Sequence, residues 1–222
     1  MKSFPIVILG GGVAAGYAAK EFVAQSGKRG DLAIVTAENA LPYERPPLSK
    51  GFLAGKEEAG DLRISDAAFY RKHGIAVFRK FQVGKVDFRR RRLQSVSGKV
   101  LGFDQLLIAT GSTVRRLRVP GANQSEVFYL RQMKNSLALH AQIKRGKRAV
   151  VIGSGFIGME VASVRQRDRA PPVAPMPQGT RAGGRNWRSR RKAGAEVFFE
   201  QQGGEKRVER REMQSIKRKA FA

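Results

Sequence analysis

Short apolar runs separated by turns organise the first 164 residues of the chain. The run at residues 5–9 ends at a series of glycines, and an alanine-rich helical pattern follows at 14–24, so a strand, a tight turn and a helix are predicted. Further strands are predicted at 32–36, 75–78, 83–87, 93–96, 106–110 and 148–152. A short helix over 66–72, capped by Ser65 and closed by Gly74, is predicted between them. This alternation is typical of an α/β fold with β-rich stretches inserted.

The pattern changes after Val164. Residues 165–222 carry 16 Lys and Arg against six Asp and Glu, and only seven residues of the Leu, Ile, Val and Phe class, none of them Leu. Burial of this small number of apolar side chains cannot offset the entropy lost when a highly charged segment becomes ordered. This tail is therefore expected to be disordered. We expect no second strand after the strand at 148–152, and only residues 195–199 in the tail look like one.

The amino-acid composition excludes some kinds of functional site and favours others. The chain has no Cys, which excludes disulfide scaffolds, Cys-based zinc sites and dithiol redox chemistry within it. A net charge of +25 suits nucleic acid, an anionic surface or a phosphate-bearing cofactor. The basic run at 89–92 has no interleaved aromatic residues, so a solvated turn is expected there and nucleic-acid binding is not. His73 and His140 have no partners spaced for a metal, so no metal site is expected.

The beginning of the chain leads directly into predicted folded structure. No apolar run approaches the roughly 20 residues of a membrane-spanning helix, and the first strand leaves no room for a targeting peptide. The sequence therefore predicts a soluble, cytoplasmic protein.

The first glycine motif fits the dinucleotide-binding pattern G-x-G-x-x-G/A. Gly10 makes the tight turn, Gly12 lets the backbone approach a pyrophosphate, and the small Ala15 permits close packing of the helix. The N-terminus of that helix presents free N–H groups to phosphates. Glu38 ends the second strand region, where an acidic residue holds ribose hydroxyls. The alternative is a glycine-rich turn in an unrelated α/β protein.

The same pattern returns at Gly153, Gly155 and Gly158, again after a strand and before a helix. Two such sites in one chain imply two dinucleotides that must meet. The common chemical reason is hydride transfer from a nicotinamide to a flavin.

Between the motifs lies PYERPPLSK at residues 42–50. Together with ILGGGVAAGYAAKEF before it and LLIATGS after it, this string resembles the monodehydroascorbate reductases. More broadly it resembles the FAD-dependent NAD(P)H reductases that include ferredoxin-type reductases and apoptosis-inducing factor. The resemblance covers residues 4 to about 163. It implies a Rossmann-like FAD-binding domain with a β-rich insertion, followed by the start of a second, NAD-binding Rossmann-like domain.

The resemblance also implies roles for particular residues. Arg45 and Lys50 would contact the flavin cofactor, and a cation at Lys50 would stabilise the negative charge of the reduced ring. Glu160 matches a glutamate that pairs with this lysine, so a Lys50–Glu160 ion pair is predicted, the alternative being a glutamate on a solvated helix face. Gln132 stands where the family would have an acidic residue. The residues expected to bind FAD or NAD(P)H are Gly10, Gly11, Gly12, Val13, Ala14, Ala15, Glu38, Arg45, Lys50, Val83, Ala109, Thr110, Gly111, Arg131, Gly153, Gly155, Phe156, Ile157 and Gly158, and Lys50 and Glu160 are the expected catalytic residues.

These expectations divide the chain into part of an FAD-binding domain at 1–114, the start of an NAD(P)-binding domain at 115–164, and the basic tail at 165–222. Because the resemblance ends abruptly after Ser163, a truncated or frame-shifted reading frame is expected.

Three functions remain open at this point. The first is an FAD-dependent oxidoreductase of cell redox homeostasis that passes electrons from NAD(P)H to a small acceptor, with monodehydroascorbate implied by the resemblance. The second is a ferredoxin- or rubredoxin-reductase-like enzyme that serves a small acidic redox protein. The third is an inactive nucleotide-binding remnant, or a basic tail that binds nucleic acid.

Overall fold

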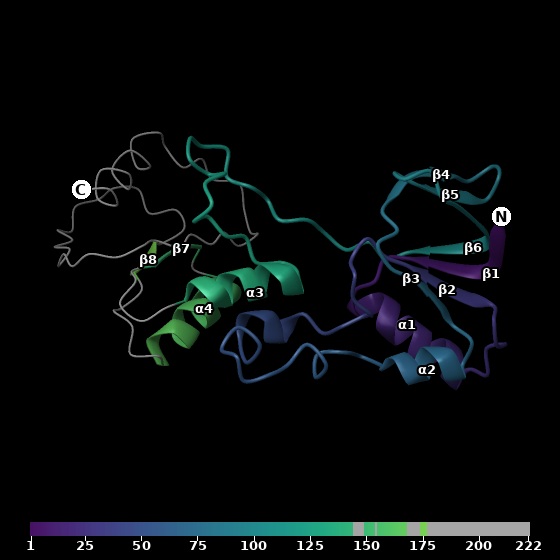
Figure 1. Cartoon of the computed structure of the whole chain (residues 1–222), viewed down its shortest axis with the longest axis horizontal. Helices are drawn as coiled ribbons and strands as arrows, with labels where there is room; N and C mark the ends of the chain where they lie inside the picture. Colours follow the sequence, from purple (N-terminus) through teal and green to yellow (C-terminus); the bar gives the residue numbers. More distant parts are fainter. Residues whose placement is uncertain (144–148, 154, 168–173, 177–222) are drawn as a thin grey trace. The chain divides into compact units, whose positions relative to one another are not determined.

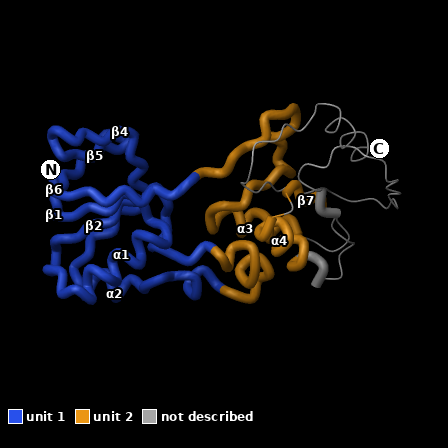
Figure 2. The backbone as a smooth tube through the Cα atoms, turned by 180° about the vertical axis from the view of Figure 1, so that it is seen from behind, with its two compact units in different colours: residues 1–45, 58–112 blue, residues 46–57, 113–222 orange. Residues whose placement is uncertain are grey.

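The computed structural model describes residues 1–143, 149–153, 155–167 and 174–176 (Figure 1). These fall into two compact units (Figure 2). Unit 1 comprises residues 1–45 and 58–112, and unit 2 comprises residues 46–57 and the described residues from 113 onward. The segment 46–57 therefore belongs to unit 2 although unit 1 residues flank it in the sequence.

A six-stranded sheet forms the centre of unit 1, in the order β3-β2-β1-β6-β5-β4. Its strands are β1 (Lys2–Leu9), β2 (Leu32–Val35), β3 (Ala76–Phe78), β4 (Val83–Asp87), β5 (Arg92–Ser95) and β6 (Val100–Ile108). The first four in this order run parallel, and β5 and β4 extend the sheet antiparallel. The expected α/β fold is confirmed, since parallel strands alternate with helices and a β-rich stretch follows.

Two helices, α1 (Val13–Ala24) and α2 (Ala67–Lys72), lie on the same side of this sheet (Figure 1). Successive strand residues point to opposite faces, so Ile8 and Ile34 pack with the helices while Val7 and Val35 join the apolar cluster on the other face. Ala15 on α1 is fully buried, and its small side chain brings the helix close to the sheet.

The predicted helices and strands of unit 1 are confirmed, most of them within one residue of their predicted ends, but β1 begins at Lys2, three residues earlier than predicted. The helix α2 is capped by Asp66, whose carboxylate accepts a 2.7 Å hydrogen bond from the backbone N–H of Phe69, and not by Ser65. Strand β6 begins at Val100, six residues earlier than predicted, because its first part pairs with β5.

Unit 2 contains a 3-10 turn at Pro46–Ser49, α3 (Met133–Gln142), β7 (Val150–Ile152), α4 (Phe156–Arg167) and β8 (Ala174–Met176). Strands β7 and β8 pair in parallel. The expectation that no second strand follows β7 is wrong, because backbone pairing does not require the apolar pattern on which that expectation rested. The strand expected at 195–199 and the tail beyond 176 lie outside the described residues. The core of unit 2 is formed by Leu53, Leu139, Ala149, Val151, Val161 and Ala162.

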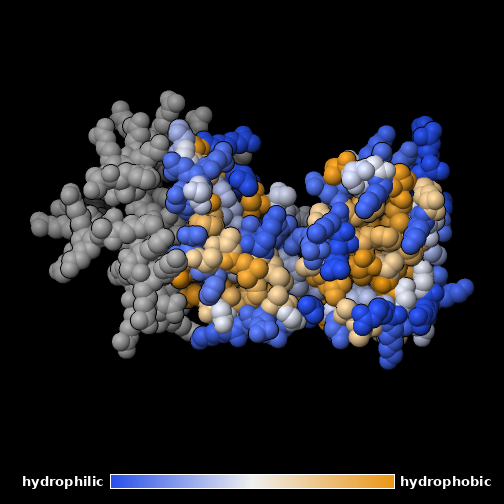
Figure 3. Space-filling model, viewed as in Figure 1, coloured by the Kyte–Doolittle hydropathy of each residue, from blue (hydrophilic) through white to orange (hydrophobic). Residues whose placement is uncertain are grey.

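In the face shown in Figure 3, hydrophobic residues gather in patches on both units and hydrophilic residues surround them. Among the described residues, no helix combines the length and apolar character needed to cross a membrane.

Candidate functional site

The first glycine turn lies at the ends of β1, β2 and β6. Gly10 has a φ of +134°, and a Cβ there would lie 2.0 Å from the carbonyl oxygen of Ala109. A Cβ on Gly11 would lie 2.4 Å from the side chain of Thr36. Larger residues would therefore push β1 away from its two neighbouring strands. Gly10 and Ala109, both predicted site residues, are brought together here.

Gly12 has a different role from these two glycines. Its backbone is extended, with φ −91° and ψ −163°, and a Cβ there would meet only the guanidinium of Arg45, at 3.6 Å. Helix α1 begins immediately afterwards, and Gly12 has no side chain that could bind the unpaired N–H groups of its first turn. A helix N-terminus and a guanidinium beside an open glycine provide what a diphosphate requires, namely N–H donors and positive charge.

A network of three side chains, from Glu38, Tyr43 and Arg45, lies next to this turn. Arg45 Nη2 lies 2.9 Å from Glu38 Oε1, and the Tyr43 hydroxyl donates a 2.7 Å hydrogen bond to Glu38 Oε2. Arg45 Nη1 in turn donates to the Tyr43 hydroxyl at 3.2 Å, and the guanidinium carbon lies 5.1 Å from the centroid of the tyrosine ring. Both carboxylate oxygens of Glu38 are therefore held in fixed directions.

Tyr43 is a residue that the sequence reasoning missed. Only 1% of its surface is exposed, so its ring is a buried support for the two predicted residues Glu38 and Arg45. A signal was present in the sequence, because an aromatic residue with a hydroxyl group precedes Arg45 by two positions in the string PYER.

The remaining predicted site residues of unit 1 lie on different elements of the fold. Val13 and Ala14 begin α1, and Thr110 and Gly111 follow β6 in exposed positions. Val83 begins β4 and packs against the apolar cluster on the sheet face opposite α1.

In unit 2 the structure contains the predicted ion pair. Lys50 Nζ lies 3.3 Å from Glu160 Oε1, and their side chains are 55% and 29% exposed. The second carboxylate oxygen, Oε2, accepts a 2.5 Å hydrogen bond from the hydroxyl of Ser49. The alternative of a glutamate on a solvated helix face is therefore wrong.

The second glycine turn repeats the architecture of the first between β7 and α4. Gly153 has a φ of +114°, and a Cβ on Gly158 would lie 2.2 Å from its carbonyl oxygen. Gly158 thus lets α4 pack closely on the turn, which is the role of the third glycine in the motif. Phe156 is 85% exposed, and Ile157 is exposed beside it.

Arg131 and Gln132 precede α3. The backbone N–H of Arg131 donates to the side-chain oxygen of Asn135 at 3.3 Å. Gln132, which occupies a position where the resemblance led us to expect an acidic residue, is the N-cap of α3 and forms a capping box with Asn135.

The two histidines and the basic turn that the sequence analysis considered make contacts within the fold. His73 stacks on Phe69 with ring centroids 4.9 Å apart, and His140 Nδ1 lies 2.8 Å from the carbonyl oxygen of Leu53. In the basic turn, the carboxylate of Asp87 accepts a hydrogen bond from the backbone N–H of Arg90. The part of the chain that the structure describes contains no cluster of three or more His, Asp or Glu arranged to hold a metal.

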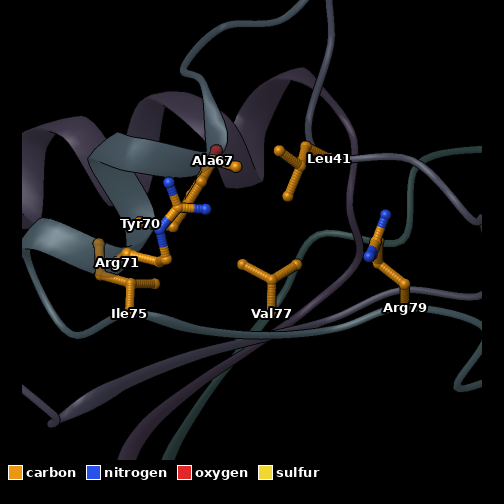
Figure 4. Close-up of a pocket in the computed structure, with 7 residues that line it drawn as sticks. All are labelled: Leu41, Ala67, Tyr70, Arg71, Ile75, Val77 and Arg79. Carbon is orange, nitrogen blue, oxygen red and sulfur yellow. The ribbon is translucent and has the colours of Figure 1, made fainter.

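A cavity of about 210 Å³ lies beside α2 and β3 (Figure 4). Its lining includes Tyr70, Arg71 and Arg79, and none of the predicted cofactor-binding residues. Burial raises the pKa of Tyr70 to about 12, above its ordinary value of 10.

This raised pKa predicts a loss of stability in alkali that depends on Tyr70. Between about pH 10 and 12 the unfolded chain releases the phenolic proton while the folded chain retains it, so the free energy of unfolding falls as the pH rises. Tyr70→Phe should lose less stability than the wild type over this range, as measured by urea unfolding at about pH 9 and about pH 11.5. Equal losses in the two proteins would show that Tyr70 does not contribute.

The chain is similar in sequence to a family of known proteins and to individual members of it. The sequence profile of the pyridine nucleotide-disulphide oxidoreductases matches residues 4–174. The chain is 41% identical over 177 residues to monodehydroascorbate reductase 2 of Arabidopsis thaliana, and the match covers 73% of this chain and 41% of that protein. The chain thus spans about two fifths of the length of this curated relative.

Two solved structures are similar to the chain at 30% identity. One is NADH:rubredoxin oxidoreductase from Clostridium acetobutylicum, with a TM-score of 0.69 and coverage of 78% of this chain and 44% of that chain. The other is the covalent putidaredoxin reductase–putidaredoxin complex, with a TM-score of 0.68 and coverage of 78% and 42%. With the glycine turns in place and a profile match over residues 4–174, the chain belongs to the pyridine nucleotide-disulphide oxidoreductase family.

Proposed function

We propose that this chain is the FAD-binding part and the beginning of the NAD(P)-binding part of an NAD(P)H-dependent flavoprotein reductase. The observation that carries the proposal is the open face of Gly12 beside Arg45, with Glu38 fixed next to it. FAD and NAD(P)H are the cofactors that this family uses. When bound, the flavin supplies the capacity to accept a hydride and to release electrons to an acceptor.

The proposed roles of the residues of unit 1 follow from their chemistry. The N–H groups at the start of α1 and the guanidinium of Arg45 bind the diphosphate. The carboxylate of Glu38 accepts hydrogen bonds from ribose hydroxyls, and Tyr43 keeps that carboxylate and Arg45 in place.

In unit 2, the second glycine turn is proposed to bind NAD(P)H through the N-terminus of α4. Lys50 is proposed to supply positive charge to the flavin ring, and Glu160 holds the lysine side chain. No residue has to act as a nucleophile in this scheme. The contribution of the chain is binding, alignment and charge.

For the electron acceptor, we propose monodehydroascorbate, which several curated relatives of this chain carry in their names. A role in cell redox homeostasis and a cytoplasmic location belong to the same proposal. The domain assignment of residues 1–114 to FAD and 115–164 to NAD(P) is proposed on the position of the two glycine turns.

A second candidate acceptor is a small acidic redox protein. Its support is the similarity to a rubredoxin oxidoreductase and to putidaredoxin reductase in complex with putidaredoxin. The net charge of +25 would attract such a partner and make the rate of association sensitive to salt.

The visible absorption spectrum of the purified, gel-filtered chain tests the proposal. We expect an oxidised flavin spectrum, or its appearance after reconstitution with FAD, and bleaching on anaerobic addition of NADH. Bound flavin that does not bleach would support the FAD site and contradict the NAD(P) site. Failure to bind FAD at all, in a chain shown by circular dichroism to be folded, would overturn the proposal.

A further inference from the structure

Helix α3 holds the backbone of the segment that carries Lys50. The buried hydroxyl of Ser136 on α3 donates a 2.7 Å hydrogen bond to the carbonyl oxygen of Leu48. One turn later on the same helix, His140 Nδ1 contacts the carbonyl oxygen of Leu53 at 2.8 Å. The Leu53 side chain, 1% exposed, packs into the core of unit 2. The backbone on both sides of Lys50 is therefore fixed to α3, while the lysine side chain itself remains more than half exposed.

The ion pair alone does not fix the lysine side chain. Pairs between exposed lysine and carboxylate groups contribute little, because two long side chains must be ordered in a screened environment. Lys50 and Glu160 both have several rotatable bonds, and the ammonium group lies 3.3 Å from the carboxylate oxygen Oε1. Something else must hold the carboxylate in the direction of the lysine.

Ser49 provides that constraint. Its residue is 4% exposed, and its hydroxyl donates to Glu160 Oε2 at 2.5 Å, 111 residues away in the sequence. A second acceptor for the same proton, among the described residues, is the carbonyl oxygen of Pro46, at 3.3 Å. A short bond to an ionised oxygen is stronger than a long one to a neutral carbonyl, so the proton goes to Glu160. With Oε2 held by Ser49, Oε1 faces Lys50.

We propose that Ser49 is the positioning residue of the Lys50–Glu160 pair: its buried hydroxyl orients the Glu160 carboxylate, and that carboxylate then holds the ammonium group of Lys50. The importance of this for electron transfer rests on the proposed role of Lys50 at the flavin. The geometric claim itself does not depend on any cofactor.

The experiment measures how fast the amino group of Lys50 is acylated in the full chain without added FAD. An amine held by a carboxylate reacts more slowly than a free one, and quantitative mass spectrometry reports Lys50 separately from Lys56, an exposed lysine on the same segment that serves as the internal standard. We expect Ser49→Ala to raise the ratio of Lys50 to Lys56 labelling about threefold, close to the increase in Glu160→Gln, which defines the unpaired lysine.

Ser136→Ala is the matched control. It removes a buried hydroxyl and a hydrogen bond to the same segment, but it leaves Glu160 untouched. The labelling ratio should stay within experimental error of the wild type. An equal rise in Ser136→Ala would overturn the proposal, because the effect would then come from loosening of the segment. An unchanged ratio in Ser49→Ala would overturn it as well.

A second pair of variants guards against a failure of Ser49→Ala to fold. Ser49→Thr and Ser49→Val have the same shape and differ only in the hydroxyl group. We expect the threonine variant to label about threefold more slowly at Lys50 than the valine variant, and equal rates would contradict the proposal. Because FAD is absent throughout, a failure to bind flavin would count against the proposed function and leave this result unaffected.

Discussion

Gly10→Ala is expected to leave unit 1 unfolded. The added Cβ would lie 2.0 Å from the carbonyl oxygen of Ala109, a backbone atom that cannot move without separating β1 from β6. The φ of +134° at Gly10 adds strain of about 1–3 kcal/mol for a residue with a side chain. The total loss should exceed about 4 kcal/mol, a large share of the roughly 5–15 kcal/mol that stabilises a typical domain. Loss of the cooperative thermal transition, followed by circular dichroism, is the measurement.

Substitutions at two other glycines of unit 1 distinguish the effect of the steric clash from the effect of backbone strain. Gly98 has a φ of +82°, and no described atom lies within 4 Å of the place where its Cβ would be, so Gly98→Ala should suffer strain alone and lose about 1 kcal/mol. Gly12→Ala should fold normally, since its backbone is extended and its Cβ meets Arg45 at an ordinary distance, but it should bind FAD poorly. A Gly10→Ala protein as stable as Gly98→Ala would show that β1 and β6 tolerate separation.

The parts of the fold that follow from local patterns were predictable. The strands around Gly10 and Gly153 are short apolar runs next to glycines, and both signals act within a few residues of each other. The Lys50–Glu160 pair is a different case, because only the resemblance to known reductases connected two residues so far apart. Neither spacing nor periodicity could have done so.

Helix α3 was not predicted, and its side chains explain why. Leu137 is 51% exposed while Ser136 is fully buried, so the apolar and polar positions do not form the stripe that marks a helix on a core. Its N-cap is Gln132, an uncommon capping residue whose action depends on Asn135. The buried serine makes sense only with the carbonyl of Leu48 as its partner, which lies 88 residues earlier.

Tyr43 was missed for a related reason. Its hydroxyl group has two partners, Glu38 and Arg45, on either side of it in the sequence, and each had been assigned a role of its own. Sequence reasoning treats residues singly, whereas a hydrogen-bonded network acts as a unit. The consequences of that coupling are measurable.

Arg45→Met is expected to weaken FAD binding more than Glu38→Gln. Removing the guanidinium takes away a positive charge beside Gly12 and also leaves the Glu38 carboxylate, which is partly buried, without its ionic partner. Each charge-assisted hydrogen bond contributes about 1.5–3 kcal/mol, so Glu38→Gln should raise the Kd for FAD roughly 10-fold to 100-fold. Arg45→Met should exceed this, because the negative charge of Glu38 then has no cation beside it and repels the diphosphate. Quenching of flavin fluorescence in a titration of apoprotein gives both values.

The double variant Glu38→Gln, Arg45→Met decides whether the two side chains act as a pair. With the carboxylate neutralised, the repulsion created by Arg45→Met disappears, so the double variant should bind FAD more tightly than the sum of the two single losses predicts. Arg90→Met is the control for net charge, since that guanidinium lies on the exposed β4–β5 turn and should leave the Kd unchanged. Strictly additive losses would mean that Glu38 and Arg45 bind the cofactor independently, and that their 2.9 Å contact does not influence its affinity.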